Sequence, residues 1–167
     1  MDMQVAAATS ADQLELIRRL FRAYAAELEI DLGFQGFEAE LAGLPGKYAP
    51  PTGGLWLATC DGEPAGCVAV RPLDAATCEM KRLYVCPPRR SGLGRRLAQV
   101  AVEFGRRAGY ARMVLDTLER MTAPLRMYES MGFRRCQAYY PNPVADAVYL
   151  SMDLAAGDVV EPTRPRR

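Results

Sequence analysis

The sequence contains no histidine among its 167 residues. This absence excludes Ser-His-Asp and Cys-His catalysis, histidine-ligated metal sites and a histidine general base. Any proton transfer would therefore use a carboxylate, a tyrosine, a cysteine, a lysine or ordered water. The chain also lacks any apolar run near the roughly 18 residues that span a bilayer. We therefore expect no metal and no membrane partner.

A strong charge of one sign is absent as well. The chain carries 21 basic and 20 acidic residues, a formal net charge of +1. Such a balance supplies no overall field that would attract nucleic acid or an anionic surface. With 50% hydrophobic and 25% charged residues, the composition is that of a globular domain. We expect one domain over residues 1–154 and a flexible tail over 155–167.

Cysteine occurs without a ligand or disulfide pattern. The chain has an odd number of cysteines and no CxxC spacing; they are Cys60, Cys67, Cys78, Cys86 and Cys136. Because most of them fall in apolar, strand-like runs, we expect reduced thiols in the core. Residues 1–8 lack the basic and apolar segments of a signal peptide. Together these features predict a cytoplasmic protein.

Hydrophobic periodicity predicts strands and helices in a mixed order. The expected strands cover 4–8, 55–60, 64–70, 77–86, 113–115, 133–140 and 147–154. The expected helices cover 14–28 with Ser10 as N-cap, 34–44, 93–108 and 125–131. A strand-helix-strand crossover lies at the centre, with antiparallel hairpins outside it. The order predicts an α+β fold, in which helices cover a mixed sheet.

A basic block occupies residues 80–102, which hold six basic residues and no acid. Inside it, residues 89–94 (RRSGLG) lie between an expected strand and an expected helix. Free N–H groups at a helix N-terminus, glycines that allow close approach, and flanking arginines suit a pyrophosphate. The segment is neither a P-loop nor a dinucleotide fingerprint. The alternative is an ordinary helix start with solvated arginines.

This segment, Arg89-x-x-Gly92-x-Gly94, resembles the Q/R-x-x-G-x-G/A motif of the GNAT superfamily of acetyl-CoA-dependent N-acetyltransferases. Residues 79–85 (EMKRLYV) resemble the fourth strand of that superfamily, and 125–133 (LRMYESMGF) its late A-x-x-x-Y-x-x-x-G-F pattern. Residues 78–85 (CEMKRLYV) also recur in small bacterial members. The resemblance covers about residues 55–154. It implies a twisted, mostly antiparallel sheet of about six to seven strands, about four flanking helices, and a splay between the fourth and fifth strands.

The resemblance implies acetyl-CoA as the cosubstrate. The backbone at Leu83, Tyr84 and Val85 would pair with the pantetheine arm, and the Val85 N–H would polarise the thioester carbonyl. The pyrophosphate would lie on Arg89, Arg90, Ser91, Gly92, Leu93, Gly94 and Arg95. Many members carry asparagine and alanine where this chain has Met121 and Pro124. The asparagine is the residue to which a pantetheine contact is usually assigned, and Met121 stands at its position here.

Two residues match catalytic positions of the superfamily. Glu79 matches a general base, which would act directly or through water, and Tyr128 matches the tyrosine that protonates the departing thiolate. Each has a structural alternative. Glu79 would pair with Lys81 or Arg82 to hold the strand, and Tyr128 would be a core aromatic.

The acceptor side is less defined by the sequence. Tyr139, Tyr140 and Asn142 would line an acceptor pocket through hydroxyl and amide groups, or would simply shape a turn. A run of acids without a basic residue separates Arg22 from Lys47: Glu27, Glu29, Asp31, Glu38 and Glu40. These acids would form a lip that favours a cationic amine, or a solvated helix face.

The leading hypothesis is an N-acetyltransferase that moves an acetyl group from acetyl-CoA to a primary amine of a small molecule or peptide. Direct attack in a ternary complex is expected, because no activated nucleophile is evident apart from a minor case for Cys86. The first alternative is a catalytically silent acyl-CoA sensor. The second, a nucleic-acid protein, rests only on the basic block. A monomer and a homodimer both remain open.

Overall fold

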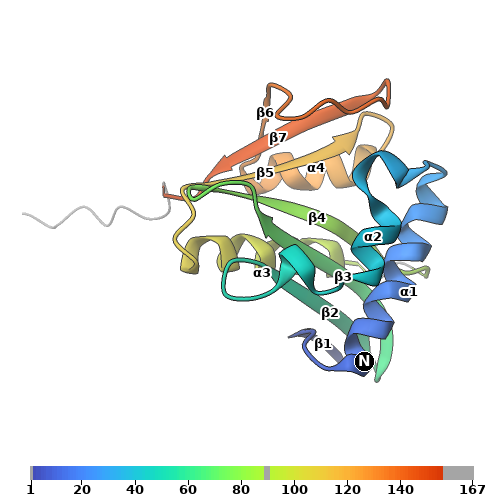
Figure 1. Cartoon of the computed structure of the whole chain (residues 1–167). Coiled ribbons are helices and arrows are strands. Elements are labelled where there is room, and N and C mark those ends of the chain that lie inside the picture. The colour runs from blue at the N-terminus through green and yellow to red at the C-terminus, as the bar shows by residue number, and fades with distance from the viewer. Residues whose placement is uncertain (1, 89–90, 156–167) are drawn as a thin grey trace, which may run out of the picture.

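The computed structural model describes residues 2–88 and 91–155. At its centre is a seven-stranded sheet with the order β1-β2-β3-β4-β5-β7-β6 (Figure 1). The strands are β1 (Met3–Ala7), β2 (Gly54–Cys60), β3 (Glu63–Pro72), β4 (Thr77–Val85), β5 (Arg112–Leu118), β6 (Arg134–Cys136) and β7 (Ala147–Asp153). Only β4 and β5 pair in parallel among these strands. The predicted mixed, mostly antiparallel sheet is confirmed.

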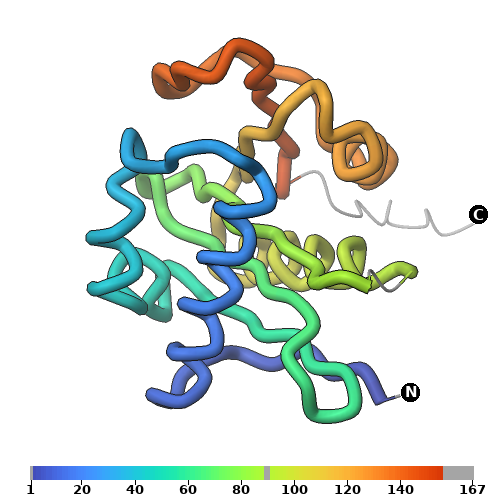
Figure 2. The backbone as a smooth tube through the Cα atoms, turned by 90° about the vertical axis from the view of Figure 1, so that its right-hand side faces the viewer, coloured from blue at the N-terminus to red at the C-terminus, as the bar shows by residue number. Residues whose placement is uncertain are grey.

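Helices cover both faces of the sheet. They are α1 (Ala11–Leu28), α2 (Phe37–Ala42), α3 (Leu93–Arg107) and α4 (Thr122–Met131), with 3-10 turns η1 (Leu32–Gln35) and η2 (Gly46–Tyr48). Figure 2 shows α1 and α2, in blue and cyan, on one side of the sheet, and α3 and α4, in yellow-green and orange, on the other. The predicted set of about four helices is confirmed in the described part of the chain.

Local sequence signals fix the helix ends. The Ser10 side chain accepts from the Gln13 N–H at 3.1 Å, and the Gln13 side chain accepts from the Ser10 N–H at 3.0 Å. This capping box starts α1 where the sequence predicted it. Gly132 ends α4 in the left-handed conformation, with φ of 108°, which favours glycine.

The sheet buries a different apolar layer on each face. Along β3, Val68 and Val70 pack in the core that α3 and α4 cover, whereas Cys67 and Ala69 pack in the core that α1 and α2 cover. This alternation follows from the two-residue period of a strand. All five cysteines are free thiols, and Cys86 and Cys136 are only partly buried.

The splay between β4 and β5 is the feature that positions the site. The two strands pair only from Thr77↔Arg112 to Glu79↔Val114, whereas β5 continues along β7 from Arg112 to Leu118. On β4, the register against β3 shifts in a bulge around Arg82, which has a left-handed φ of 58°. Bulges bend a strand and increase its twist. Beyond Glu79, β4 therefore presents an edge that β5 does not cover, as predicted.

Two expected elements differ from the prediction. The strand expected over 133–140 is limited to Arg134–Cys136. Tyr139 and Tyr140 donate to carboxylates instead of continuing a strand, and Pro141 and Pro143 after them have no N–H for a ladder. The second expected helix is divided into η1 and α2 by Gly36, whose φ is 69°. The tail expected from 155 lies outside the described residues from 156 onward.

The bulge is held by an ion pair with α2. Arg82 donates to Glu40 from Nε at 3.0 Å and from Nη2 at 3.2 Å. The Arg82 side chain is only 3% exposed and that of Glu40 16%. The guanidinium also lies 5.2 Å from the centre of the Phe37 ring. Glu40 is therefore a partner of a buried cation and not a residue of an acidic lip.

We expect Glu40→Ala to lower the free energy of unfolding by about 3 kcal/mol, because it leaves the buried Arg82 charge without its partner. The matched control is Glu38→Ala on the same helix. Glu38 pairs with Arg22 at 3.1 Å, but both side chains are more than half exposed, so the loss should stay below about 1 kcal/mol. Urea unfolding measures both values, and equal losses would contradict this role of Glu40.

Candidate active site

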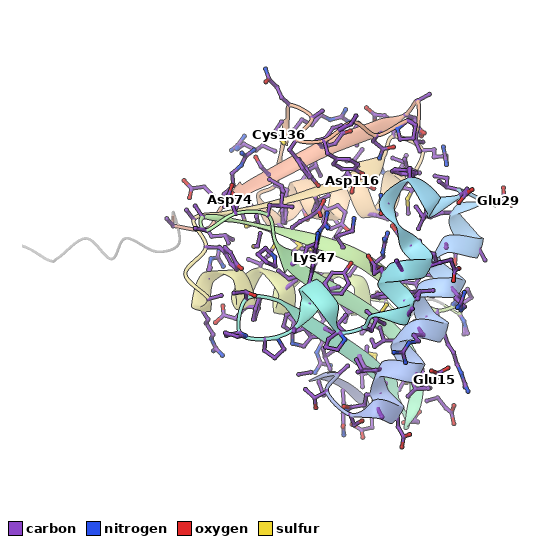
Figure 3. All side chains as sticks on the ribbon, in the orientation of Figure 1. Glu15, Glu29, Lys47, Asp74, Asp116 and Cys136 are labelled. Carbon is purple, nitrogen blue, oxygen red and sulfur yellow. The ribbon has the colours of Figure 1, made fainter. Side chains whose placement is uncertain are left out.

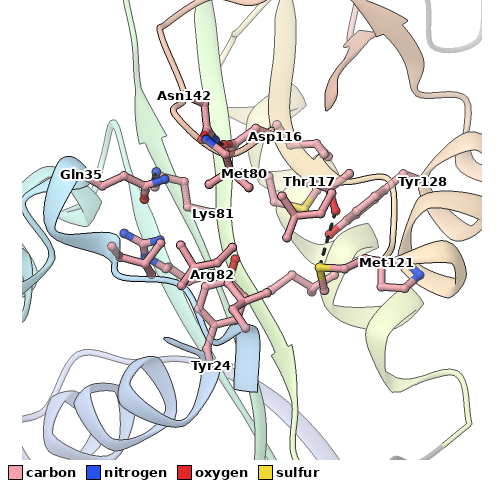
Figure 4. Close-up of a pocket in the computed structure, with 18 of the residues that line it drawn as sticks. Tyr24, Gln35, Met80, Lys81, Arg82, Asp116, Thr117, Met121, Tyr128 and Asn142 are labelled. Atoms are coloured by element: carbon pink, nitrogen blue, oxygen red, sulfur yellow. Dashed lines mark hydrogen bonds between the residues drawn. The ribbon is translucent and has the colours of Figure 1, made fainter. Parts of the chain in front are cut away.

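Two neighbouring cavities occupy the splay. The outer one has a volume of about 610 Å³ and the inner one about 90 Å³. Figure 4 shows the inner cavity, between the side chains of α1, β4, β5 and α4. Both cavities are lined by Tyr24, Leu28, Leu83, Met121 and Pro124. The two spaces therefore meet along a shared wall, with a long groove on one side and a small chamber on the other.

The outer cavity collects most of the predicted cofactor residues. Six of them line it, namely Leu83, Tyr84, Val85, Gly92, Gly94 and Arg95. Leu93 is 1% exposed and packs in the core, so only its backbone can face a ligand. Ser91 is exposed and does not line the cavity, and Arg89 and Arg90 lie outside the described residues.

The start of α3 borders this cavity with N–H groups that make no hydrogen bond within the helix. The first hydrogen bond of the helix runs from the Arg96 N–H to the Gly92 carbonyl at 3.0 Å, and no side chain caps the N-terminus at Gly92. The N–H groups of residues 92–95 thus have no intrahelical partner. Gly92 has φ of 81°, a conformation that costs other residues about 1–2 kcal/mol. The geometry suits an anion.

The open edge of β4 presents a backbone donor. The Cys86 N–H donates to the Ala65 carbonyl of the β3 side at 2.9 Å. Because successive N–H groups of an extended strand point to opposite edges, the Val85 N–H points away from β3. That edge borders the outer cavity, which Val85 lines. An extended ligand can therefore add to β4 there as a further strand would.

Glu79 lies beneath the inner cavity and does not line it. Its side chain is fully buried. One oxygen accepts from Arg71 Nε at 2.7 Å and lies 3.8 Å from Lys81 Nζ, and the other accepts from the Tyr139 hydroxyl. Arg71 is the residue opposite Glu79 in the β3–β4 pairing. The main cation beside Glu79 is thus Arg71, which the sequence did not single out.

Tyr128 lines the inner cavity from α4. Its ring packs edge-on against Phe133, with centres 5.8 Å apart, and none of the hydrogen bonds found among the described residues uses its hydroxyl. Burial raises the pKa of Tyr128 well above its ordinary value, and the charges at Tyr24 and Asp116 raise it further. The phenol is therefore protonated at neutral pH and able to donate.

The predicted acceptor residues surround a carboxylate that the sequence did not assign. Asp116 on β5 lines the inner cavity and accepts from the Tyr140 hydroxyl and, at 3.0 Å, from Asn142 Nδ2. Asn142 also lines the cavity, whereas Tyr140 and Tyr139 lie behind its wall. Figure 3 shows Asp116 in the interior of the molecule, while Glu15 and Glu29 lie at its periphery.

The opposite wall carries a buried cation. Lys81 is 7% exposed, and its Nζ donates to Gln35 Oε1 at 3.1 Å. Figure 4 shows these two side chains together, apart from Asp116 and Asn142. Burial lowers the pKa of Lys81, and the charge of Glu79 opposes that shift. Asp116 directly follows the apolar run 113–115 of β5, and an acid at the end of a buried run was the signal that could have identified it.

The remaining wall of the two cavities is apolar. Met121 and Pro124 line both cavities, and Met121 Sδ accepts from Thr117 Oγ1 at 4.0 Å.

The acidic run does not form a lip. Asp31 caps the Gly33 N–H at 2.8 Å, and Glu38 and Glu40 pair with arginines. Only Glu27 lines a cavity of the site, the outer one.

The fold is that of known acetyltransferases. A crystal structure of an acetyltransferase from Streptococcus agalactiae has a TM-score of 0.75 at 23% identity, covering 90% of this chain and 98% of that one. A GNAT family acetyltransferase from Elizabethkingia anophelis, solved with acetyl-CoA bound, has a TM-score of 0.59 at 20% identity, covering 90% and 97%. The sheet and its splay thus define the GNAT acyltransferase fold.

The sequence comparisons are more specific. Residues 15–133 match the Acetyltransferase (GNAT) family. An uncharacterized N-acetyltransferase of Schizosaccharomyces pombe is 36% identical over 157 residues, which cover 92% of this chain and 96% of that protein. The chain therefore belongs to the GNAT acetyltransferase family and is an acyltransferase. The yeast relative shows that the likeness extends beyond bacteria.

No helix within 2–88 and 91–155 is both long and apolar enough to cross a membrane. No group of three or more cysteine, aspartate or glutamate side chains in the same ranges is arranged to hold a metal ion.

All eight tyrosines have pKa values raised by burial. Tyr24 is raised to about 12, against about 10 in an unfolded chain. Because the folded protein binds the phenolic proton more tightly than the unfolded chain, ionisation of a tyrosine destabilises the folded state. For Tyr24, the free energy of unfolding should therefore fall as the pH rises from about 10 to about 12. Absorbance near 295 nm should show no phenolate below about pH 10 in the native protein. A native phenol that ionises earlier would contradict the prediction.

Proposed function

We propose that the protein transfers an acetyl group from acetyl-CoA to the primary amine of a small molecule or peptide. The observation that carries the proposal is the pair of cavities that meet at the open edge of β4. One is long and borders a helix N-terminus, and the other is small and polar. The relative with bound acetyl-CoA supports the choice of donor.

In this proposal, the outer cavity holds the cofactor. The N–H groups of residues 92–95 bind the pyrophosphate, with Arg89, Arg90 and Arg95 as charged neighbours. The backbone at Leu83 to Val85 pairs with the pantetheine arm. The Val85 N–H, which points to the open edge, donates to the thioester oxygen and stabilises the charge that develops on it.

The acceptor amine attacks the thioester carbon directly, and the carbon–sulfur bond breaks. A primary ammonium loses two protons in the overall reaction. One leaves before attack, and the other compensates the proton that the CoA thiolate receives. Tyr128 is the proposed donor to the thiolate, because it lines the inner cavity and no other described residue competes for its hydroxyl proton.

Glu79 remains a proposed base only through an intervening group. Its carboxylate is bonded to Arg71 and Tyr139 and does not border the cavity. A proton would reach it through water or through Tyr139. The same contacts favour the structural alternative, in which Glu79 neutralises the cations of β3 and β4.

The proposal also includes the domain organisation, the cellular compartment and the oligomeric state. Residues 1–154 form the single catalytic domain, with 155–167 as an appended tail. Five free thiols suit a reducing compartment such as the cytoplasm. The enzyme works as a monomer or a homodimer. Among the described residues, nothing in the cavities favours a silent sensor, because a protonated phenol and a carboxylate both line the inner chamber.

Acetyl-CoA binding tests the donor site. We expect calorimetry to show binding by the wild-type protein, and Gly92→Glu to weaken it at least tenfold, or about 1.4 kcal/mol. The substitution places a side chain at a residue with a left-handed φ and adds a negative charge beside the proposed pyrophosphate site. Gly62→Glu is the matched control, because Gly62 also has a left-handed φ, of 82°, but lies in the β2–β3 turn. No binding by the wild type would refute the donor site.

Removing the Tyr128 hydroxyl tests the acid. Tyr128→Phe keeps the ring against Phe133, so we expect kcat to fall roughly 10²-fold while acetyl-CoA affinity is unchanged. The readout is thiol release with an amine that the wild-type protein acetylates. Tyr110→Phe, which removes a hydroxyl bonded to the Thr52 carbonyl at 2.6 Å, serves as a control away from the site. An unchanged kcat in Tyr128→Phe would show that Tyr128 is not the group that protonates the thiolate.

A further inference from the structure

A belt of hydrogen bonds lies along one side of the inner cavity. It runs from Lys81 Nζ to Gln35 Oε1 at 3.1 Å, from Gln35 Nε2 to the Tyr140 hydroxyl at 3.2 Å, and from that hydroxyl to Asp116 Oδ2. Asn142 joins the end of the belt by donating to Asp116 and to Tyr140, both at 3.0 Å. Four separate segments of the chain thus fix one cation and one carboxylate around a single small space.

Among the described residues the carboxylate makes no ion pair with a cation, although the charge of Lys81 interacts with it at longer range. The partners of Asp116 are a phenol and an amide, both neutral, and both contact Oδ2. Among the described residues, no ion pair involves Asp116, and no hydrogen bond reaches its Oδ1. Asp116 is only partly buried and lines the cavity. One oxygen of this carboxylate is therefore available to a cationic ligand.

The wall formed by β4 carries an excess of positive charge. Glu79 is one negative charge shared between Arg71 at 2.7 Å and Lys81 at 3.8 Å. Arg82, the other cation on this stretch of β4, is matched by Glu40. Two cations against one carboxylate leave one positive charge on this wall. Lys81 is the member of the group that borders the cavity, so the excess faces the ligand there.

We propose that the acceptor is a small zwitterion, an amine that also carries a carboxylate, as an amino acid does. Asp116 Oδ1 binds the ammonium group, and Lys81 binds the carboxylate. This inference rests on the proposed acetyltransfer and specifies its acceptor. A ligand with both charges completes both imbalances at once, whereas a simple amine or a polyamine would leave Lys81 unmatched and add positive charge beside it.

The arrangement also gives Asp116 a chemical part. A carboxylate in contact with the acceptor ammonium can accept the proton that leaves before attack. The amine then attacks the thioester carbon with its free electron pair, and the thiolate leaves and is protonated. Tyr140 and Asn142 are positioning residues, because they hold Asp116 Oδ2 and so turn Oδ1 toward the cavity.

The test compares acceptors that differ only in the carboxylate. The amino acids are glycine, L-alanine, β-alanine, L-aspartate and L-glutamate, and the matched amines are methylamine, ethylamine and propylamine. Two readouts are used: thiol release with acetyl-CoA, and calorimetric binding to the protein saturated with CoA. We expect at least one amino acid to exceed its matched amine by about tenfold or more in kcat/KM and in affinity.

Two variants test the roles proposed for Lys81 and Asp116. Lys81→Met should remove the preference by weakening the amino acid to the level of the amine, with acetyl-CoA affinity unchanged. Asp116→Asn should lower kcat for every acceptor by roughly 10²-fold. Lys47→Met and Asp153→Asn are the controls. Lys47, the other lysine of the chain, and Asp153 are exposed and line neither cavity of the site.

The outcomes separate this inference from the function on which it rests. If acetyl-CoA does not bind, both fail. If acetyl-CoA binds and simple amines or polyamines are acetylated as well as any amino acid, only the zwitterion inference fails. It also fails if no amino acid binds the CoA complex, or if Lys81→Met abolishes turnover of amines and amino acids alike, since Lys81 would then not be a carboxylate receptor.

Discussion

The separation of β4 from β5 after Glu79 is the constraint on which the rest of the structure depends. Parallel pairing stops after three residues, and the bulge around Arg82 turns the remainder of β4 away. The separation leaves backbone donors on an open edge and a space between two strands that are otherwise neighbours. The start of α3 lies beside one end of this space, and the polar chamber lies at the other. Neither a groove nor a chamber would exist in a continuous sheet.

Keeping the strands apart places charged groups in the interior. Arg82, Lys81 and Glu79 are all buried on one short stretch of β4. Each is paired: Arg82 with Glu40, and Glu79 with Arg71 and Lys81. Such groups are costly to desolvate and are tolerated when their hydrogen bonds are satisfied. The polarity of this stretch therefore marks the place where the sheet holds a site instead of a core.

Much of the fold could be predicted because its signals are local. The N-cap at Ser10 and the end of α4 each depend on a few adjacent residues, and the splay was expected from the family resemblance. Six residues of the predicted cofactor site line the outer cavity, and they lie on one strand end and one helix start. The expected strand over 133–140 was too long, because prolines and side-chain bonds to distant carboxylates ended it.

The inner cavity, the proposed acceptor site, was harder to predict from the sequence. Its belt joins residues 35, 81, 116, 140 and 142, and no spacing in the chain relates them. Arg71 and Glu79 lie on different strands and meet only through the register of β3 and β4. A sequence shows that such residues are polar, but not that the fold brings them to one wall. Charge balance around a cavity is a property of the folded chain alone.

The segment between β6 and β7 gives the two halves of the site different evolutionary freedom. It contributes Asn142 and Val144 to the inner cavity and no residue to the outer one, and it lies outside the sheet ladder. Insertions or substitutions there can reshape the chamber while leaving β4 and the start of α3 untouched. A lineage built on this scaffold can therefore keep one donor site and diversify its acceptors by changing a single connection.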